Sequence, residues 1–186
     1  CLYRGLGVEQ NKEEGIQLIK EAAEGEDVEA LCYYGKLLKK GEDVHIDKEM
    51  AYKYIETASK KKLPEALYQL GLIYESGDFP GIEKNDLRAQ GLFKQSSDAG
   101  HPKAQFHLGK IYLQNDRKKE GVELIDKAAK QNLIEAYSEM ARIYNEGDGV
   151  EQDLDKALDY QQMADDPLYQ EKKNMTMSTF NSAKKP

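Results

Sequence analysis

The chain has 186 residues, of which 39% are hydrophobic and 33% charged, and its formal net charge is −7. This length and composition suffice for one domain with a continuous hydrophobic core. The acidic balance argues against a general nucleic-acid binder, and no apolar run approaches the roughly 18 residues of a membrane-spanning helix. We therefore expect neither a nucleic-acid partner nor insertion into a membrane.

The first residues resemble a segment near the other end of the chain. Residues 5–10 read Gly-Leu-Gly-Val-Glu-Gln, and residues 147–152 read Gly-Asp-Gly-Val-Glu-Gln. In the later copy this stretch has the composition of a loop between two helices. The sequence therefore predicts the second helix of a repeat over about residues 11–24, with residues 1–29 as a partial repeat of a longer array.

A related run then recurs four times. Each copy begins with an alanine, and these alanines are 36, 38 and 32 residues apart (Ala30, Ala66, Ala104 and Ala136). Apolar residues follow at positions 0, 1, 4, 7 and 8 after the alanine, which is one face of a helix with 3.6 residues per turn. Position 5 is always small, which suggests close approach of a neighbouring helix (Gly35, Gly71, Gly109 and Ala141). We call this first helix of each repeat helix A.

A second helix, helix B, follows in each repeat. It carries two small residues seven positions apart, for example Ala51 and Ala58, and eight further residues lead to the next opening alanine. Only the stretch between helix A and helix B varies in length, as a surface loop can at small entropic cost. Glycines mark the predicted ends of helix A (Gly41, Gly77 and Gly147), and Asp or Asn caps helix B (Asp47, Asn85 and Asp153).

The repeat pattern stops after Ala164. Residues 165–167 read Asp-Asp-Pro, which should break the helix, and residues 174–186 show no periodicity. We expect residues 166–186 to form a short segment and a tail that is disordered or docked on a surface. One expected partner is a second copy of the chain, bound through this tail.

The combined pattern resembles the Sel-1-like repeat family, a helical relative of the tetratricopeptide repeat. Its most specific stretch covers residues 146–157, Glu-Gly-Asp-Gly-Val-Glu-Gln-Asp-Leu-Asp-Lys-Ala. The resemblance implies an all-α fold over residues 1–165, a right-handed superhelical solenoid of antiparallel helix pairs with about nine helices. It also implies that helix A lines the concave side and that the protein is an adaptor or scaffold.

Residues for catalysis or metal binding do not form recognisable motifs. His45, His101 and His107 make no pair at i, i+4, and Cys1 and Cys32 form no Cys-x2-Cys motif. We therefore expect no enzymatic activity, no metal and no cofactor. The cysteine usage favours a reducing, cytoplasmic compartment, while the incomplete first repeat leaves the lumen of the secretory pathway open.

Positions 2, 6 and 9 of helix A share a face that is separate from the apolar stripe. We call it the helix-A face, and its candidate protein-binding residues are Lys36, Lys39, Tyr68, Leu72, Phe106, Lys110, Leu113 and Arg142. One interpretation is a groove for a peptide or protein segment with acidic groups. The other is that the rings pack on neighbouring helices and the cations are solvated.

Two functions fit this sequence. The first is a non-catalytic scaffold or adaptor that binds another protein on the helix-A face. The alternative is a regulatory or substrate-recruiting part of a larger enzyme, such as a kinase or a ubiquitin-ligase component.

Overall fold

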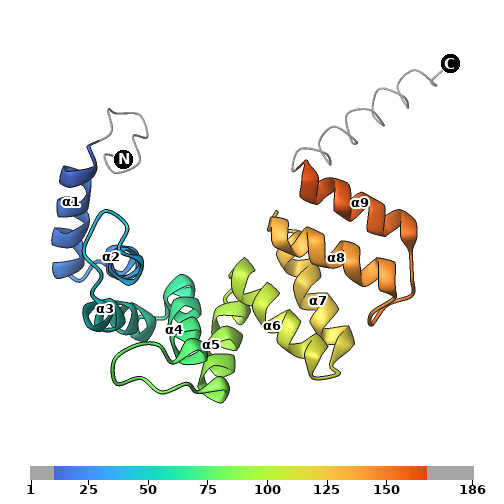
Figure 1. The fold of residues 1–186 in the computed structure, drawn as a ribbon, viewed down its shortest axis with the longest axis horizontal. Helices are drawn as coiled ribbons and strands as arrows, with labels where there is room; N and C mark the ends of the chain where they lie inside the picture. Colours follow the sequence, from blue (N-terminus) through green and yellow to red (C-terminus); the bar gives the residue numbers. More distant parts are fainter. Residues whose placement is uncertain (1–10, 167–186) are drawn as a thin grey trace. The chain divides into compact units, whose positions relative to one another are not determined.

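The computed structural model describes residues 11–166. This part of the chain holds nine α-helices and no strand (Figure 1). The helices are α1 (Lys12–Glu24), α2 (Val28–Lys40), α3 (Lys48–Lys60), α4 (Pro64–Ser76), α5 (Asp86–Asp98), α6 (Pro102–Gln114), α7 (Lys118–Ala129), α8 (Ile134–Glu146) and α9 (Leu154–Asp165). The predicted all-α fold of helix pairs is confirmed. The predicted C-terminal tail lies outside the described residues.

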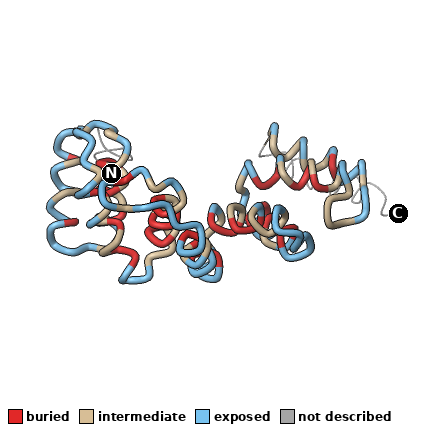
Figure 2. Tube along the Cα trace, turned by 60° about the horizontal axis from the view of Figure 1, so that its bottom comes forward, coloured by how far each residue is buried: buried red, intermediate tan, exposed pale blue. Residues whose placement is uncertain are grey.

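The chain divides into two units, with the boundary between His101 and Pro102. The first contains α1–α5 and the second contains α6–α9. Within each unit every helix packs against the next one along the chain. Helix A of a repeat is α2, α4, α6 or α8, and each packs closely on the helix B that follows it. Figure 2 shows the buried residues on the helix faces that meet neighbouring helices.

The seam between helix A and helix B depends on the small residue at position 5. A Cβ atom built on Gly71 would lie 2.5 Å from Cε1 of Phe93, and one built on Gly109 would lie 2.7 Å from Cγ1 of Ile125. Phe93 and Ile125 are fully buried. The glycines therefore let a large apolar side chain of helix B lie directly against the backbone of helix A. This is the packing reason that the recurrence of small residues predicts.

Local signals in the sequence set the ends of the helices. The side chains of Asp47, Asn85 and Asp153 accept a hydrogen bond from the backbone N–H three residues later, at the start of α3, α5 and α9. Three helix-A ends are left-handed glycines (Gly41, Gly77 and Gly147). In the fourth repeat the loop is shorter, and α7 begins after Arg117 without a side-chain cap.

A pair of glycine substitutions tests the seam. Gly71→Ala should lower the free energy of unfolding by about 1–2 kcal/mol, because the added methyl displaces the buried Phe93 ring and overpacking outweighs the helix-propensity gain. Gly91 is the matched control, since it lies inside α5 and a Cβ there meets no atom within 4 Å. Gly91→Ala should raise stability by about 0.5–1 kcal/mol. Urea unfolding measures the free energy of unfolding of both variants. An equal gain in stability from the two substitutions would show that the seam has room for an added methyl group.

Candidate protein-binding surface

The residues predicted for the helix-A face lie on four helices in the two units. Lys36 and Lys39 are on α2 and Tyr68 and Leu72 are on α4, all in the first unit. The second unit carries the rest, with Phe106, Lys110 and Leu113 on α6 and Arg142 on α8. The structure describes the surroundings of these residues within each unit.

In the first unit, Lys36 is part of a charged cluster centred on Glu65. Its Nζ donates to Oε1 of Glu65 at 2.7 Å, and Nε2 of Gln69 donates to the same oxygen at 3.0 Å. The other carboxylate oxygen lies 2.8 Å from Nε2 of His101. Hydrogen bonds from His101 and Lys36 hold the pKa of the Glu65 carboxyl well below its usual range. The charge of Lys36 is thus already matched by a carboxylate of the next helix A.

The other residues of this face in the first unit are partly engaged in packing. The Tyr68 ring lies 5.8 Å from that of Phe93 and 5.2 Å from that of His101, between ring centroids. Lys39 lies 6.0 Å from the centroid of the Phe79 ring, and burial lowers the pKa of its ammonium group. Cys32, at position 2 of α2, is buried. The face is therefore only partly open to a partner in this unit.

In the second unit, an aromatic ring and a cation lie together at the surface of α6. Phe106 and Leu113 are half-buried and pack against the core of this unit. Lys110 is exposed, and its Nζ lies 5.6 Å from the centroid of the Phe106 ring. A cation over an aromatic face is a mild attraction on its own, and it leaves the ring edge and the ammonium group near solvent.

Arg142 is held by three carboxylates of its own unit. Its guanidinium donates to Glu139 at 2.8 Å, to Asp148 at 3.2 Å, and to Glu146. The hydrogen bonds that Arg142 donates to Glu139 and Asp148 raise the pKa of its guanidinium further above the usual range. Glu139 and Glu146 lie three and four residues from Arg142 on α8, and side chains at these spacings are neighbours on a helix surface. Arg142 is therefore a less available cation than its position suggests.

A recurring ion pair joins consecutive repeats, and our sequence reasoning missed it. The first residue of helix B pairs with an aspartate in the loop that follows the next helix A. In the first unit the pairs are Lys12–Asp43 and Lys48–Asp78, and in the second unit Lys118–Asp148, each with an N–O distance of 3.1 Å. These pairs are 31, 30 and 30 residues apart, a recurrence that could have been found in the sequence.

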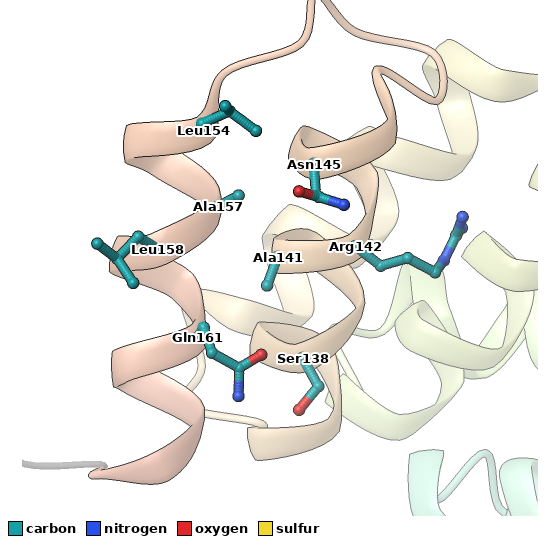
Figure 3. A pocket seen from close by; sticks show the side chains of 8 residues that line it. All are labelled: Ser138, Ala141, Arg142, Asn145, Leu154, Ala157, Leu158 and Gln161. Carbon is teal, nitrogen blue, oxygen red and sulfur yellow. The ribbon is translucent and has the colours of Figure 1, made fainter.

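The second unit has a groove of about 440 Å³ between α8 and α9 (Figure 3). It is lined by Ser138, Ala141, Arg142, Asn145, Leu154, Ala157, Leu158 and Gln161. Leu154 and Leu158 are 61% and 58% exposed. Figure 3 shows the guanidinium of Arg142 turned away from α9. Of these residues, the sequence singled out only Arg142 as a site candidate.

Within residues 11–166 there is neither a cluster of metal-binding side chains nor an accessible free cysteine. No group of three or more His, Cys, Asp or Glu side chains within residues 11–166 is placed to hold a metal ion. Cys32 is a free thiol, and burial raises its pKa to about 12, so it is a poor nucleophile. Among the described helices, none has the length and apolar character needed to cross a bilayer.

The sequence profile of the Sel1 repeat matches residues 1–27, 28–63, 64–101, 102–133 and 134–164. The chain therefore belongs to the Sel1 repeat family, and the predicted resemblance is confirmed. Sel1 repeats are a helical fold typical of protein-interaction scaffolds.

Curated relatives and a solved structure agree with this assignment. The chain is 34% identical over 120 residues to chitin synthase regulatory factor 3 of Schizosaccharomyces pombe, which covers 60% of the chain and 12% of that protein. It is 28% identical over 101 residues to DAP3-binding cell death enhancer 1 of Rattus norvegicus. This match covers 54% of the chain and 19% of that protein. The crystal structure of a Sel1 repeat protein from Oxalobacter formigenes is similar to this chain, with a TM-score of 0.77 and 28% sequence identity. The match covers 88% of this chain and 68% of that one. The chain thus spans less than a fifth of the two curated relatives.

The Glu65 cluster makes stability depend on pH. Because the folded pKa of Glu65 is depressed, its stabilising contribution is present above the unfolded pKa of about 4.3 and is lost as the pH falls toward the folded value. Glu65→Gln should cost about 1–2 kcal/mol at pH 7 and much less at pH 3. Urea unfolding at both pH values measures this, with the exposed Glu123 of α7 changed to Gln as the control. An unchanged cost at pH 3 would contradict the ionic role of Glu65.

Proposed function

We propose that this chain is a protein-interaction scaffold that holds a peptide or protein segment against the helix-A face. The observation that carries the proposal is the surface pair formed by Phe106 and Lys110. A half-buried ring beside an exposed cation offers a partner both apolar area and a charge to orient on. Membership of the Sel1 repeat family and similarity to a DAP3-binding protein support a binding role.

The charges on this face favour one place for an acidic group of the partner. Lys36 and Arg142 already meet carboxylates of the chain, so an incoming acidic group would have to displace them. Lys39 is partly desolvated, which weakens its ammonium form. We therefore propose Lys110 as the residue that attracts an acidic partner group. Leu113, in the same unit as Lys110, would supply apolar contact area there, and Tyr68 and Leu72 would supply it separately on the first unit.

A second candidate function is that the array recruits or regulates an enzyme. A relative is named as a regulatory factor of chitin synthase, and the chain corresponds to 12% of its length. In this case the helix-A face would hold the enzyme or its substrate, and the chain itself would carry no catalytic group. Reconstitution of a captured enzyme with the chain distinguishes the two functions, because a regulator changes turnover and a passive scaffold does not.

Substitutions on α6 test the proposed face. Phe106→Ala should abolish most partner capture through loss of apolar contact, and Lys110→Glu should slow association, since rim charges act mainly on the association rate. Lys127→Glu, on an exposed position of α7, is the charge-matched control. Proteins retained from an extract of the source organism are compared by quantitative mass spectrometry.

Partners lost from both α6 variants but retained by the control would support the proposal. Circular dichroism must show unchanged helix content in each variant. Folded α6 variants that retain every partner would place the binding surface elsewhere.

A further inference from the structure

A small pocket opens between α2 and the start of α4 in the first unit, and we call it the α2–α4 pocket. Its volume is about 240 Å³, which is below the range of pockets for drug-sized ligands and suits a single side chain. It is lined by Glu29, Cys32, Tyr33, Lys36, Leu63 and Glu65. Glu29 is the exposed member of this set and Cys32 is a buried one. The pocket thus has an apolar floor and a carboxylate at its mouth.

A small side chain at position 2 of helix A leaves this pocket open. That position is Cys32 in α2, but it carries a ring in α4 and α6, Tyr68 and Phe106. The Tyr68 ring lies 5.2 Å from the ring of His101, which stands three residues before the next opening alanine, as Leu63 does in the repeat before. Phe106 packs against the apolar cluster to which α8 contributes. A thiol is smaller than these rings, so space remains beside Leu63.

The charges around the pocket are only partly matched. Lys36 donates to one oxygen of Glu65 at 2.7 Å, and the other oxygen lies 2.8 Å from Nε2 of His101. No cation or hydrogen-bond donor within residues 11–166 is paired with the side chain of Glu29. Two glutamates and one lysine give the lining one net negative charge. A cation that enters the pocket can therefore bind Glu29 without displacing an existing ion pair.

The equivalent positions of the second unit have a different chemistry. Lys103 takes the place of Glu29, one residue before the opening alanine, and the lysine at position 6 is retained as Lys110. Phe106 takes the place of Cys32, and Lys110 lies over its ring. These positions therefore carry a ring and two lysines where the first unit has a pocket and a free carboxylate. The two units thus differ in both the shape and the charge that they offer to a partner.

We propose that the α2–α4 pocket binds a basic side chain, arginine or lysine, of a partner protein. The inference rests on the proposed scaffold function and deepens it by naming a residue type in the bound segment. The aliphatic stem of such a side chain would lie along Cys32 and Leu63, with its charged end near solvent at the mouth. There the cation would bind the Glu29 carboxylate, and an arginine can do so with two parallel hydrogen bonds. The Tyr33 ring offers the same cation an aromatic surface.

The test uses the 186-residue chain as bait for a phage-displayed library of random seven-residue peptides. We expect enriched peptides to share an arginine or lysine, and its replacement by methionine in a synthetic peptide should weaken binding at least about tenfold. Glu29→Gln should weaken binding by a similar factor, because it removes the carboxylate that pairs with the cation. Fluorescence polarisation of the labelled peptide measures each affinity.

Glu49→Gln is the matched control for Glu29→Gln. Both glutamates are exposed, and each is the second residue of its helix, α3 or α2. Their interactions with the helix N-terminus are therefore alike, but Glu49 does not line the pocket. Glu49→Gln should leave the affinity unchanged.

A further variant tests the shape of the pocket. Cys32→Phe gives α2 the ring that α6 carries at the same position, so it should abolish binding by filling the pocket. Circular dichroism and urea unfolding establish whether this variant folds. If it is poorly folded, Glu29→Lys replaces it, since it changes an exposed residue and introduces the charge that Lys103 provides in the second unit. It should abolish binding as well.

Four results would overturn the proposal. The first is the absence of enriched peptides, or enrichment of peptides without a basic residue. The second is equal affinity of the unchanged chain and the Glu29→Gln variant. The third is competition by a synthetic peptide of residues 1–10, which would assign the pocket to the chain itself. The fourth is a dimer that Glu29→Lys dissociates, which would assign it to a second copy. Phe106 and Lys110 do not line the pocket, so their variants test the scaffold function separately.

Discussion

The structure depends on the contact between the two helices of each repeat. A small residue on helix A leaves its backbone open, and a fully buried Ile55, Phe93 or Ile125 of helix B lies against it. This contact brings the two helices close enough to bury a shared apolar face, which neither helix could bury alone. The fifth repeat departs from the rule, because Ala141 replaces the glycine and Gln161 takes the place of the large apolar side chain. Both residues line the groove between α8 and α9.

The second level of organisation is the docking of each repeat on the one before it. Within a unit, helix B of one repeat packs on helix A of the next, and the contact is marked by the recurring lysine–aspartate pair. The pairs are largely solvent-exposed, so each contributes at most about 1 kcal/mol. The groove between α8 and α9 is the surface at which this docking pattern is not continued among the described residues.

Much of the fold could be predicted because its signals are local. The alanine and glycine spacing gives the two helices of each repeat, and the glycine and Asp or Asn positions give their ends. The small residue at position 5 correctly predicts the close seam. These features depend on residues within one turn or one loop, so periodicity and capping are sufficient to find them.

The candidate site was harder to predict because its chemistry depends on distant residues. The face shared by positions 2, 6 and 9 is a property of one helix, but the partner of Lys36 is Glu65, which lies 29 residues away. Helical periodicity cannot show that Tyr68 packs on Phe93, or that Arg142 is turned toward Asp148. The groove was missed for the same reason. Its leucines stand out only when α9 is compared with α3 and α7 in the folded chain.

The central claim is that each repeat is stabilised by the repeat that packs against it. Native-state hydrogen exchange measures it directly, because opening free energies report the packing around each helix. α3 packs extensively against both α2 and α4, whereas within residues 11–166 the extensive packing of α9 is on α8, with one hydrogen bond from Tyr160 to Asp126 of α7. The account predicts that amides of α9 exchange with a clearly lower opening free energy than those of α3. Equal protection of the two helices would contradict it, since α9 would then be covered as fully as a helix inside the array.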